Sequence, residues 1–259
     1  MRILALSLLT SSLLLAGCAG HTVHVPSQEE LAKTHEQNKL LEQASSATTP
    51  EAAIEAFKHA GDLGSGKGYY QLAKMYTTDQ RVAPDHKLAH EYLLQADALG
   101  YNDATIMLAW TTMYGIRTEK DEDRGIEYMK KAAETDVRAK REMGLMYGNM
   151  RLPFLDKESR GLSYLLEASE KGDAEAGYYA SQLATRLGKA DVAKSAMQVA
   201  ADRGQPKAQL SIGREALAKG QYMIARENFL KSALSYDSEA MFELGKGISE
   251  GVFPPTQTV

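Results

Sequence analysis

Small and large apolar residues recur along the chain in one pattern. In residues 139–148 the small residue Ala139 is followed by Met143 at plus four, Gly144 at plus five and Tyr147 at plus eight. Offsets of four and eight return to one face of an α-helix, and a small residue beside that face lets a second helix approach closely. The stretch therefore predicts an amphipathic helix that packs tightly on a neighbour.

The same pattern starts six times, at intervals of 32 to 37 residues. The starts are Gly68, Ala104, Ala139, Ala176, Ala208 and Ala240. The first five are each followed by a second stretch of helical apolar periodicity, and Gly100, Gly172 and Gly204 are placed to end three of these second helices. A period of this length is typical of a helical repeat array. A single helix pair cannot bury its apolar stripe, so we expect the pairs to stack into an all-α solenoid.

The third repeat resembles the Sel1-like repeat family, a relative of the tetratricopeptide repeats. The matching residues are Met143-Gly144, Tyr147-Gly148 and the run from Ala168 to Gly172. The resemblance extends over roughly residues 50–251 and implies a right-handed α-solenoid. The fourth and fifth repeats have short loops and a length nearer the 34 residues of a tetratricopeptide repeat, so their subtype stays open.

The N-terminus has the features of a lipoprotein signal peptide at residues 1–17. Arg2 precedes an apolar run at residues 3–14, which is shorter than the ~20 residues needed to span a bilayer. Leu15-Ala16-Gly17-Cys18 resembles a bacterial lipobox, and Cys18 is the only cysteine. We expect Cys18 to carry palmitate and diacylglycerol; the alternative is an ordinary signal peptide with an incidental cysteine.

Ala19 follows the cysteine, where an aspartate would oppose outer-membrane sorting in enterobacteria-like lipoproteins. This resemblance implies an outer-membrane lipoprotein that faces the periplasm. Residues 18–48 are then a lipidated, polar tether. Ser27 and Glu30 form a possible capping box for a polar helix that reaches about Gln43. That helix is either a solvated stalk, which we favour, or packs on the first repeat.

The repeat domain is predicted to cover residues 49–251, followed by a C-terminal tail at 252–259. Thr49 and Pro50 fit the N-cap and first position of a helix that closes the array at residues 51–60. At the other end, residues 240–251 form a helix of the first type without a second helix after it.

Charge and cysteine content restrict the class of partner. The chain carries 30 basic and 34 acidic residues, and removal of the leader with Arg2 changes the net charge from −4 to −5. The charges are mixed along the sequence, whereas nucleic-acid binders usually carry a basic stripe. We expect no nucleic-acid partner, and no disulfide within a mature chain whose single cysteine is acylated.

Residues 61–68 resemble a phosphate-binding loop as far as Lys67. The position after the lysine needs a hydroxyl to bind magnesium, but it is Gly68, and the stretch follows a helix rather than a strand. We therefore interpret it as a glycine-rich turn between repeat helices and expect no nucleotide binding.

Metal and catalytic motifs are weak. His86 and His90 share a helix face without a further ligand, so we interpret them as solvated, as we do His21 and His24. The acidic run at residues 121–123 favours the N-terminus of the next helix. The mature chain lacks a free thiol and the usual serine motifs. We expect no metal, no cofactor and no catalytic activity.

Binding is the better prospect, through a row of side chains at plus two and plus six of each first helix. These positions point away from the predicted core face and are rich in aromatic and aliphatic residues. They are Tyr70 and Lys74, Ile106 and Trp110, Arg141 and Leu145, Tyr178 and Gln182, Leu210 and Arg214, and Phe242 and Lys246. We predict that Tyr70, Ile106, Trp110, Arg141, Tyr178 and Arg214 contact a partner; the alternative is that the row is half-buried against adjacent helices.

These expectations describe an envelope scaffold that binds other proteins and is held to a membrane by its lipid. The resemblance implies assistance in assembling a secretion, exopolysaccharide or motility complex. Two alternatives stay open: a cell-wall-acting enzyme or peptidoglycan-binding protein, and a pilotin-type assembly lipoprotein.

Overall fold

The computed structural model describes residues 25–253, and this range consists of helices joined by short loops, without a strand. The helices are α1 (Gln28–Ser46), α2 (Pro50–Asp62), α3 (Gly66–Thr78), α4 (His86–Ala98), α5 (Asn102–Tyr114), α6 (Glu122–Ala133), α7 (Val137–Tyr147), α8 (Glu158–Glu170), α9 (Ala174–Arg186), α10 (Ala190–Asp202), α11 (Pro206–Ala218), α12 (Tyr222–Leu234) and α13 (Ser238–Ser249). Each helix packs against the helices before and after it in the sequence. The chain is a right-handed α-solenoid.

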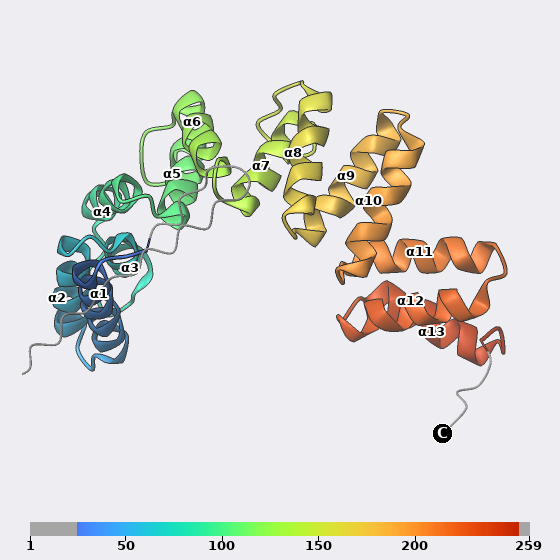
Figure 1. The fold of residues 1–259 in the computed structure, drawn as a ribbon, viewed down its shortest axis with the longest axis horizontal. Helices are drawn as coiled ribbons and strands as arrows, with labels where there is room; N and C mark the ends of the chain where they lie inside the picture. The colour runs from blue at the N-terminus through green and yellow to red at the C-terminus, as the bar shows by residue number, and fades with distance from the viewer. Residues whose placement is uncertain (1–24, 254–259) are drawn as a thin grey trace, which may run out of the picture.

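The helix pairs form an arch (Figure 1). The predicted first helices are the odd-numbered ones from α3 to α13, and the even-numbered helix that follows each is its second helix. In the left half of the arch, α3 and α5 lie toward its inner side, and α4 and α6 lie toward its outer side (Figure 1). In this half of the arch, α3 and α5 therefore face the concave side.

Local sequence signals set the ends of these helices. Aspartate side chains accept a backbone N–H near the start of five helices: Asp85, Asp121, Asp136, Asp173 and Asp237. Gly100, Gly172 and Gly204 occupy the left-handed region after α4, α8 and α10, which confirms their predicted role as helix terminators. The acidic run at residues 121–123 lies at the start of α6, as predicted.

Glycine brings the helices of a pair into close contact. A Cβ atom added to Gly144 of α7 would lie 2.7 Å from Cγ of Leu165 in α8. A Cβ atom added to Gly161 of α8 would lie 2.5 Å from the backbone nitrogen of Gly148. The small residue at plus five therefore has the predicted function of admitting a neighbouring helix.

The apolar core runs through the array as clusters that successive helices share. One cluster joins α5, α6 and α7 through residues such as Met113, Met129 and Met143, and the next joins α7, α8, α9 and α10 through Leu145, Leu165 and others. Each pair therefore buries its apolar stripe against its neighbours, which is why the pairs are stable only as a stack.

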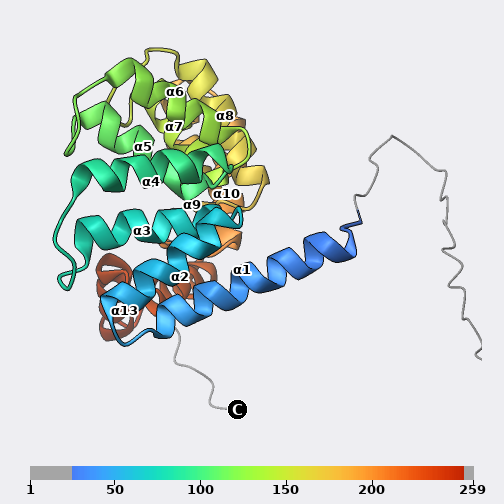
Figure 2. The ribbon, with the colours of Figure 1, turned by 90° about the vertical axis from the view of Figure 1, so that its left-hand side faces the viewer.

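The first described helix, α1, is a solvated stalk in one part and packs on the array in the other, so each of the two predicted alternatives applies to part of it. The Ser27–Glu30 capping box is present, with Oγ of Ser27 accepting the N–H of Glu30. The N-terminal part of α1 projects from the arch (Figure 2), whereas Leu40 and Ala44 are buried, and Ala44 belongs to a cluster with Ala53 and Phe57 of α2. The predicted solvated stalk therefore corresponds only to the N-terminal part of α1. Near its C-terminal end, the apolar residues of α1 pack on the array.

Thr49 and Pro50 hold their predicted positions at the start of α2. The stretch at residues 61–68 joins α2 to α3, and an added Cβ on Gly68 would lie 2.7 Å from the nitrogen of Gly61. Gly61 and Gly68 therefore serve the contact between α2 and α3, whereas Gly64 has the positive φ of a turn glycine. The signal peptide, Cys18, His21, His24 and the tail beyond residue 253 lie outside the described residues. Among residues 25–253, every helix is too short or too polar to cross a membrane.

Candidate protein-binding surface

Three of the six predicted binding residues line one hollow. Tyr70 of α3 and Ile106 and Trp110 of α5 border a cavity of about 390 Å³, together with Met107, Thr111 and residues of α7. Its lining combines aromatic and aliphatic side chains with Asp103, Arg138 and Glu142, and it comes from three successive odd helices. The size and lining suit one or two large side chains of a partner.

Aromatic stacking fixes the shape of this hollow. The rings of Trp110 and Tyr114 stack with centroids 5.7 Å apart and an angle of 2° between their planes. The hydroxyl of Tyr114 donates a hydrogen bond of 2.8 Å to the carbonyl of Leu152, which ties α5 to the loop after α7. Tyr70 lies against Tyr101, with centroids 5.3 Å apart. Rigid aromatic rings bury contact area at low entropic cost, which suits an anchor site.

Charged groups at the rim are paired within the chain. The guanidinium of Arg138 bonds to Asp103 and, at 2.7 Å, to Oδ2 of Asp136, and these hydrogen bonds raise its pKa. On α7, Glu142 is buried and bonded to Arg151, and burial outweighs that attraction and raises the pKa of its carboxyl. The hollow therefore offers apolar contact framed by ion pairs that are already satisfied.

The structure assigns the other members of the row to different environments. Leu145 and Leu210 are buried in the core, at 1% and 3% exposure, so these two positions do not face outward as the offset predicted. Leu145 is buried in the cluster that α7 shares with α8 and α9, and Leu210 in the cluster that α11 shares with α12 and α13. Both side chains are more deeply buried than the half-buried interpretation of the row predicted, whereas that interpretation fits Tyr70, Ile106 and Trp110, which are partly buried against core clusters.

Arg141 and Arg214 pair with acidic residues of the following odd helix. Arg141 donates to Oδ2 of Asp173 at 2.6 Å and lies 3.1 Å from Glu175. Arg214 lies 3.1 Å from Glu239 and 2.9 Å from Glu243. These ion pairs link α7 to α9 and α11 to α13, so both arginines contribute to the spacing of the odd helices.

Tyr178 and Phe242 lie farther along the array. Tyr178 packs on a small buried cluster of Ala200, Ala201 and Ala208, whereas Phe242 is 68% exposed on α13. Neither residue lines the hollow that Tyr70, Ile106 and Trp110 share. The candidate surface is therefore narrower than the predicted row.

Sequence reasoning missed several residues of the hollow. Asp103 and Arg138 stand one position before their repeat starts, and Met107 stands at plus three. On a helix, minus one, plus two and plus six are spaced by three and four residues, so they share a face. That spacing could have added Asp103 and Arg138. Tyr114 does not line the hollow, but it lies four residues after Trp110 and stacks on it, while Thr112 takes the buried plus-eight position.

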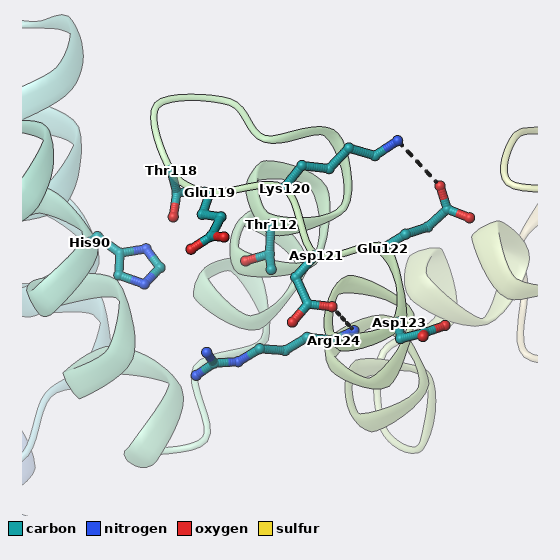
Figure 3. A pocket seen from close by; sticks show the side chains of 9 residues that line it. All are labelled: His90, Thr112, Thr118, Glu119, Lys120, Asp121, Glu122, Asp123 and Arg124. Atoms are coloured by element: carbon teal, nitrogen blue, oxygen red, sulfur yellow. Dashed lines mark hydrogen bonds and ion pairs between the residues drawn. The ribbon is translucent and has the colours of Figure 1, made fainter.

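A second, polar hollow of about 710 Å³ lies between α4 and the loop that joins α5 to α6 (Figure 3). His90 points from α4 toward Thr118 and Glu119 on that loop. His86 is exposed, as predicted, but His90 is half-buried, and burial followed by the charge of Arg124 lowers its pKa. The solvated interpretation therefore holds for His86, whereas His90, which lines this hollow, is partly shielded from solvent.

The acidic residues around this hollow have local structural contacts. Asp121 accepts the backbone N–H of Arg124 at 3.0 Å, and Glu122 lies 3.5 Å from Nζ of Lys120. Within residues 25–253, no group of three or more histidine, cysteine or acidic side chains is arranged to hold a metal ion. The hollow between α3, α5 and α7, which three of the predicted residues line, is the candidate site.

The helix pairs that build this site match a known repeat. The Sel1 repeat profile matches residues 66–101, 102–135 and 137–173, which are the pairs α3–α4, α5–α6 and α7–α8. The chain contains three Sel1 repeats. A Sel1-repeat array exposes an extended surface suited to protein–protein interaction. Among curated proteins, no sequence matches the chain.

Solved structures share the fold. A Sel1 repeat protein from Oxalobacter formigenes is 21% identical, with a TM-score of 0.69, over 88% of this chain and 69% of that one. The protein c5321, a protective antigen of uropathogenic Escherichia coli, is 20% identical, with a TM-score of 0.66, over 85% of this chain. The aligned region is 49% of c5321, so this chain spans about half of its length.

Proposed function

We propose that this Sel1-repeat protein is a non-enzymatic scaffold that binds an envelope protein through the hollow between α3, α5 and α7. The observation that carries the proposal is the convergence of Tyr70, Ile106 and Trp110 on one apolar hollow of about 390 Å³. Hot spots of protein interfaces are enriched in tryptophan, tyrosine and arginine set in such pockets. Because the rim charges are paired within the chain, the occupant is expected to insert an apolar side chain.

The lipid anchor is the second part of the proposal. The lipobox-like Leu15-Ala16-Gly17-Cys18 supports acylation of Cys18, and more than one acyl chain gives stable membrane attachment. The body would then face the periplasm from the outer membrane, with the projecting part of α1 between the lipid and the arch. In this position the scaffold could bring its partner to the membrane during assembly of a secretion, exopolysaccharide or motility complex.

A co-purification experiment tests the binding site. Trp110→Ala removes the largest ring of the hollow and is expected to reduce recovery of the partner at least tenfold, since truncating an interface hot spot costs about 2 kcal/mol or more. Leu99→Ala is the control, because Leu99 is an exposed apolar residue outside the hollow. Unchanged recovery with a folded Trp110→Ala protein would reject the site.

Metabolic labelling tests the anchor. Wild-type protein is expected to incorporate labelled palmitate and to sediment with membranes, whereas Cys18→Ala should do neither. Both proteins keep the same repeats, so a difference reports on the anchor. Equal labelling of the two proteins would reject acylation at Cys18.

A further inference from the structure

Exposed apolar side chains gather at the C-terminal end of the arch. Nine of the sixteen large apolar side chains that are exposed among residues 25–253 belong to residues 222–248. They include Leu234, Met241, Phe242 and Ile248, at 73%, 44%, 68% and 57% exposure. The end of a repeat array normally carries a polar outer face for solubility. Such a patch on a protein surface marks an interaction site.

The repeats of this chain show what normally covers these positions. At plus five, Ala109, Gly144, Ser181 and Gly213 are buried in α5, α7, α9 and α11, whereas Gly245 of α13 is exposed. At plus eight the corresponding residues are Thr112, Tyr147, Ala184 and Ala216, all buried, whereas Ile248 is exposed. An even-numbered helix follows each of the four earlier helices, and within the described residues no helix follows α13.

The glycine contacts locate the uncovered notch. An added Cβ on Gly144 would lie 2.7 Å from Cγ of Leu165, and one on Gly213 would lie 2.6 Å from Cδ1 of Phe229. An added Cβ on Gly245 would meet no atom within 4 Å. In each covered case a large apolar side chain of the following even helix fills the space above the glycine. Gly245 has the same helix position and an empty space above it.

The even helices share a pattern that fits this notch. Each carries a small residue followed four positions later by a large apolar one: Ala89 and Leu93, Gly125 and Met129, Gly161 and Leu165, Ala193 and Met197, Ala225 and Phe229. The pair α7–α8 is the nearest precedent for α13, because Glu142-Met143-Gly144 corresponds to Glu243-Leu244-Gly245.

We propose that α13 binds an amphipathic helix of a partner protein, which packs on Gly245 as α8 packs on Gly144. The partner helix has a small residue and, four positions later, a large apolar residue that fills the notch and covers Met241 and Ile248. A second copy of this chain is the poorer match, because its α13 would present the odd-helix pattern instead of the even-helix one. This surface lies on other helices than the hollow at Tyr70, Ile106 and Trp110.

A peptide that copies α8 is a suitable probe. We would use residues 157–171 with a fluorescent label and a hydrocarbon staple that replaces Ser159 and Ser163, both of which are exposed in the array. The staple lowers the cost of ordering an isolated short helix. Fluorescence anisotropy with the full chain in detergent is expected to show saturable binding. The same peptide with Gly161→Leu should bind at least tenfold more weakly, because the small residue allows the close approach.

Variants of the full chain separate the notch from other surfaces. Gly245→Gln should weaken peptide binding at least tenfold while keeping the fold, because open space surrounds the position and glutamine favours helix more than glycine does. Lys246→Gln, which is exposed on another side of the same helix, should bind the peptide as wild type does. Trp110→Ala should also leave peptide binding unchanged, because Trp110 lies in the hollow between α3, α5 and α7. Failure of the notch proposal and failure of the hollow proposal can therefore be distinguished.

Two results would overturn the proposal. One is peptide binding that is absent from the wild-type chain or is equal for Gly245→Gln and wild type. The other is a wild-type dimer in light scattering that Gly245→Gln converts to a monomer, since the notch would then belong to a contact between copies.

Discussion

Tyr236 adopts a left-handed backbone conformation that glycine takes at the same position after several other helices. It follows α12 with φ of 61°, at the turn position that Gly100, Gly172 and Gly204 take after α4, α8 and α10. The left-handed region costs a residue with a Cβ atom about 1–2 kcal/mol. The side chain is 89% exposed, so it contributes little packing.

Replacement of this tyrosine by glycine should therefore stabilise the chain. For Tyr236→Gly we expect the free energy of unfolding to rise by about 1 kcal/mol, because the turn strain is relieved while glycine's extra freedom in the unfolded chain offsets part of the gain. Urea unfolding followed by circular dichroism measures the change. A loss of stability would show that the tyrosine ring makes a contact that outweighs the strain.

Acid should weaken the caps that join successive repeats. Burial alone would raise the pKa of the Asp237 carboxyl, but the N–H of Ala240 and the ammonium of Lys207, 3.0 Å away, hold this pKa below its ordinary value. A carboxyl with a lowered folded pKa stabilises the protein above its unfolded pKa of about 4, and this contribution is lost as the pH falls through the folded value.

Asp237→Asn isolates this effect, since asparagine caps a helix as well as aspartate does but does not titrate. The free energy of unfolding of the variant should depend less on pH between pH 5 and pH 3 than that of wild type. Urea titrations at several pH values measure the two slopes. Parallel curves would mean that Asp237 does not contribute to the acid sensitivity.

At the residue scale, offsets from the repeat starts predicted part of the candidate site. Tyr70, Ile106 and Trp110 were found because plus two and plus six lie away from the core face, and all three line the hollow. The same offsets placed Leu145 and Leu210 on that face, where both are buried. Offset alone could not separate these cases, because burial at a given offset depends on how neighbouring pairs are rotated.

At the element scale, helix glycines lie in two opposite environments. Gly161 of α8 has backbone atoms of Gly148 and Gly144 within 2.8 Å of its added Cβ, so a methyl group there forces α7 and α8 apart. Gly245 of α13 has open space instead. The same substitution should therefore change stability in opposite directions at the two sites.

We expect Gly161→Ala to destabilise the chain by about 1–3 kcal/mol, the usual cost of overpacking. Gly245→Ala should stabilise it by up to about 1 kcal/mol, because alanine favours the helix interior more than glycine does. Urea unfolding of both variants beside wild type gives the comparison. Equal effects at the two positions would contradict the assigned helix–helix contact.

The elements themselves were predictable to a large extent. The recurring offsets, the aspartate caps and the terminating glycines mark helices from α2 to α13 in the sequence. The polar segment was harder, because α1 has a thin apolar stripe whose packing depends on α2, and its two halves have different surroundings. Because one part of α1 lies in solvent and the other packs on the array, its pattern of apolar and polar residues does not indicate a single environment for the whole helix.

At the scale of the whole molecule, the arch arises from small rotations that accumulate from one pair to the next. The repeat period predicted the solenoid, but the rotation depends on side-chain volumes at each interface. For that reason the hollow between three odd helices, and the open face of α13, became visible only in the structure. Both surfaces are suited to protein partners, and they lie in different parts of the arch (Figure 1).

Site-specific photo-crosslinking in intact cells tests the central claim, binding of a protein partner in the α3–α5–α7 hollow, most directly. A photoreactive phenylalanine at Tyr70, within the hollow, is compared with one at the exposed Glu91 of α4. The account predicts a discrete crosslinked protein from position 70 that is absent from position 91 and disappears when Trp110→Ala is added. The same crosslinked protein from both positions, or one that is insensitive to Trp110→Ala, would contradict it.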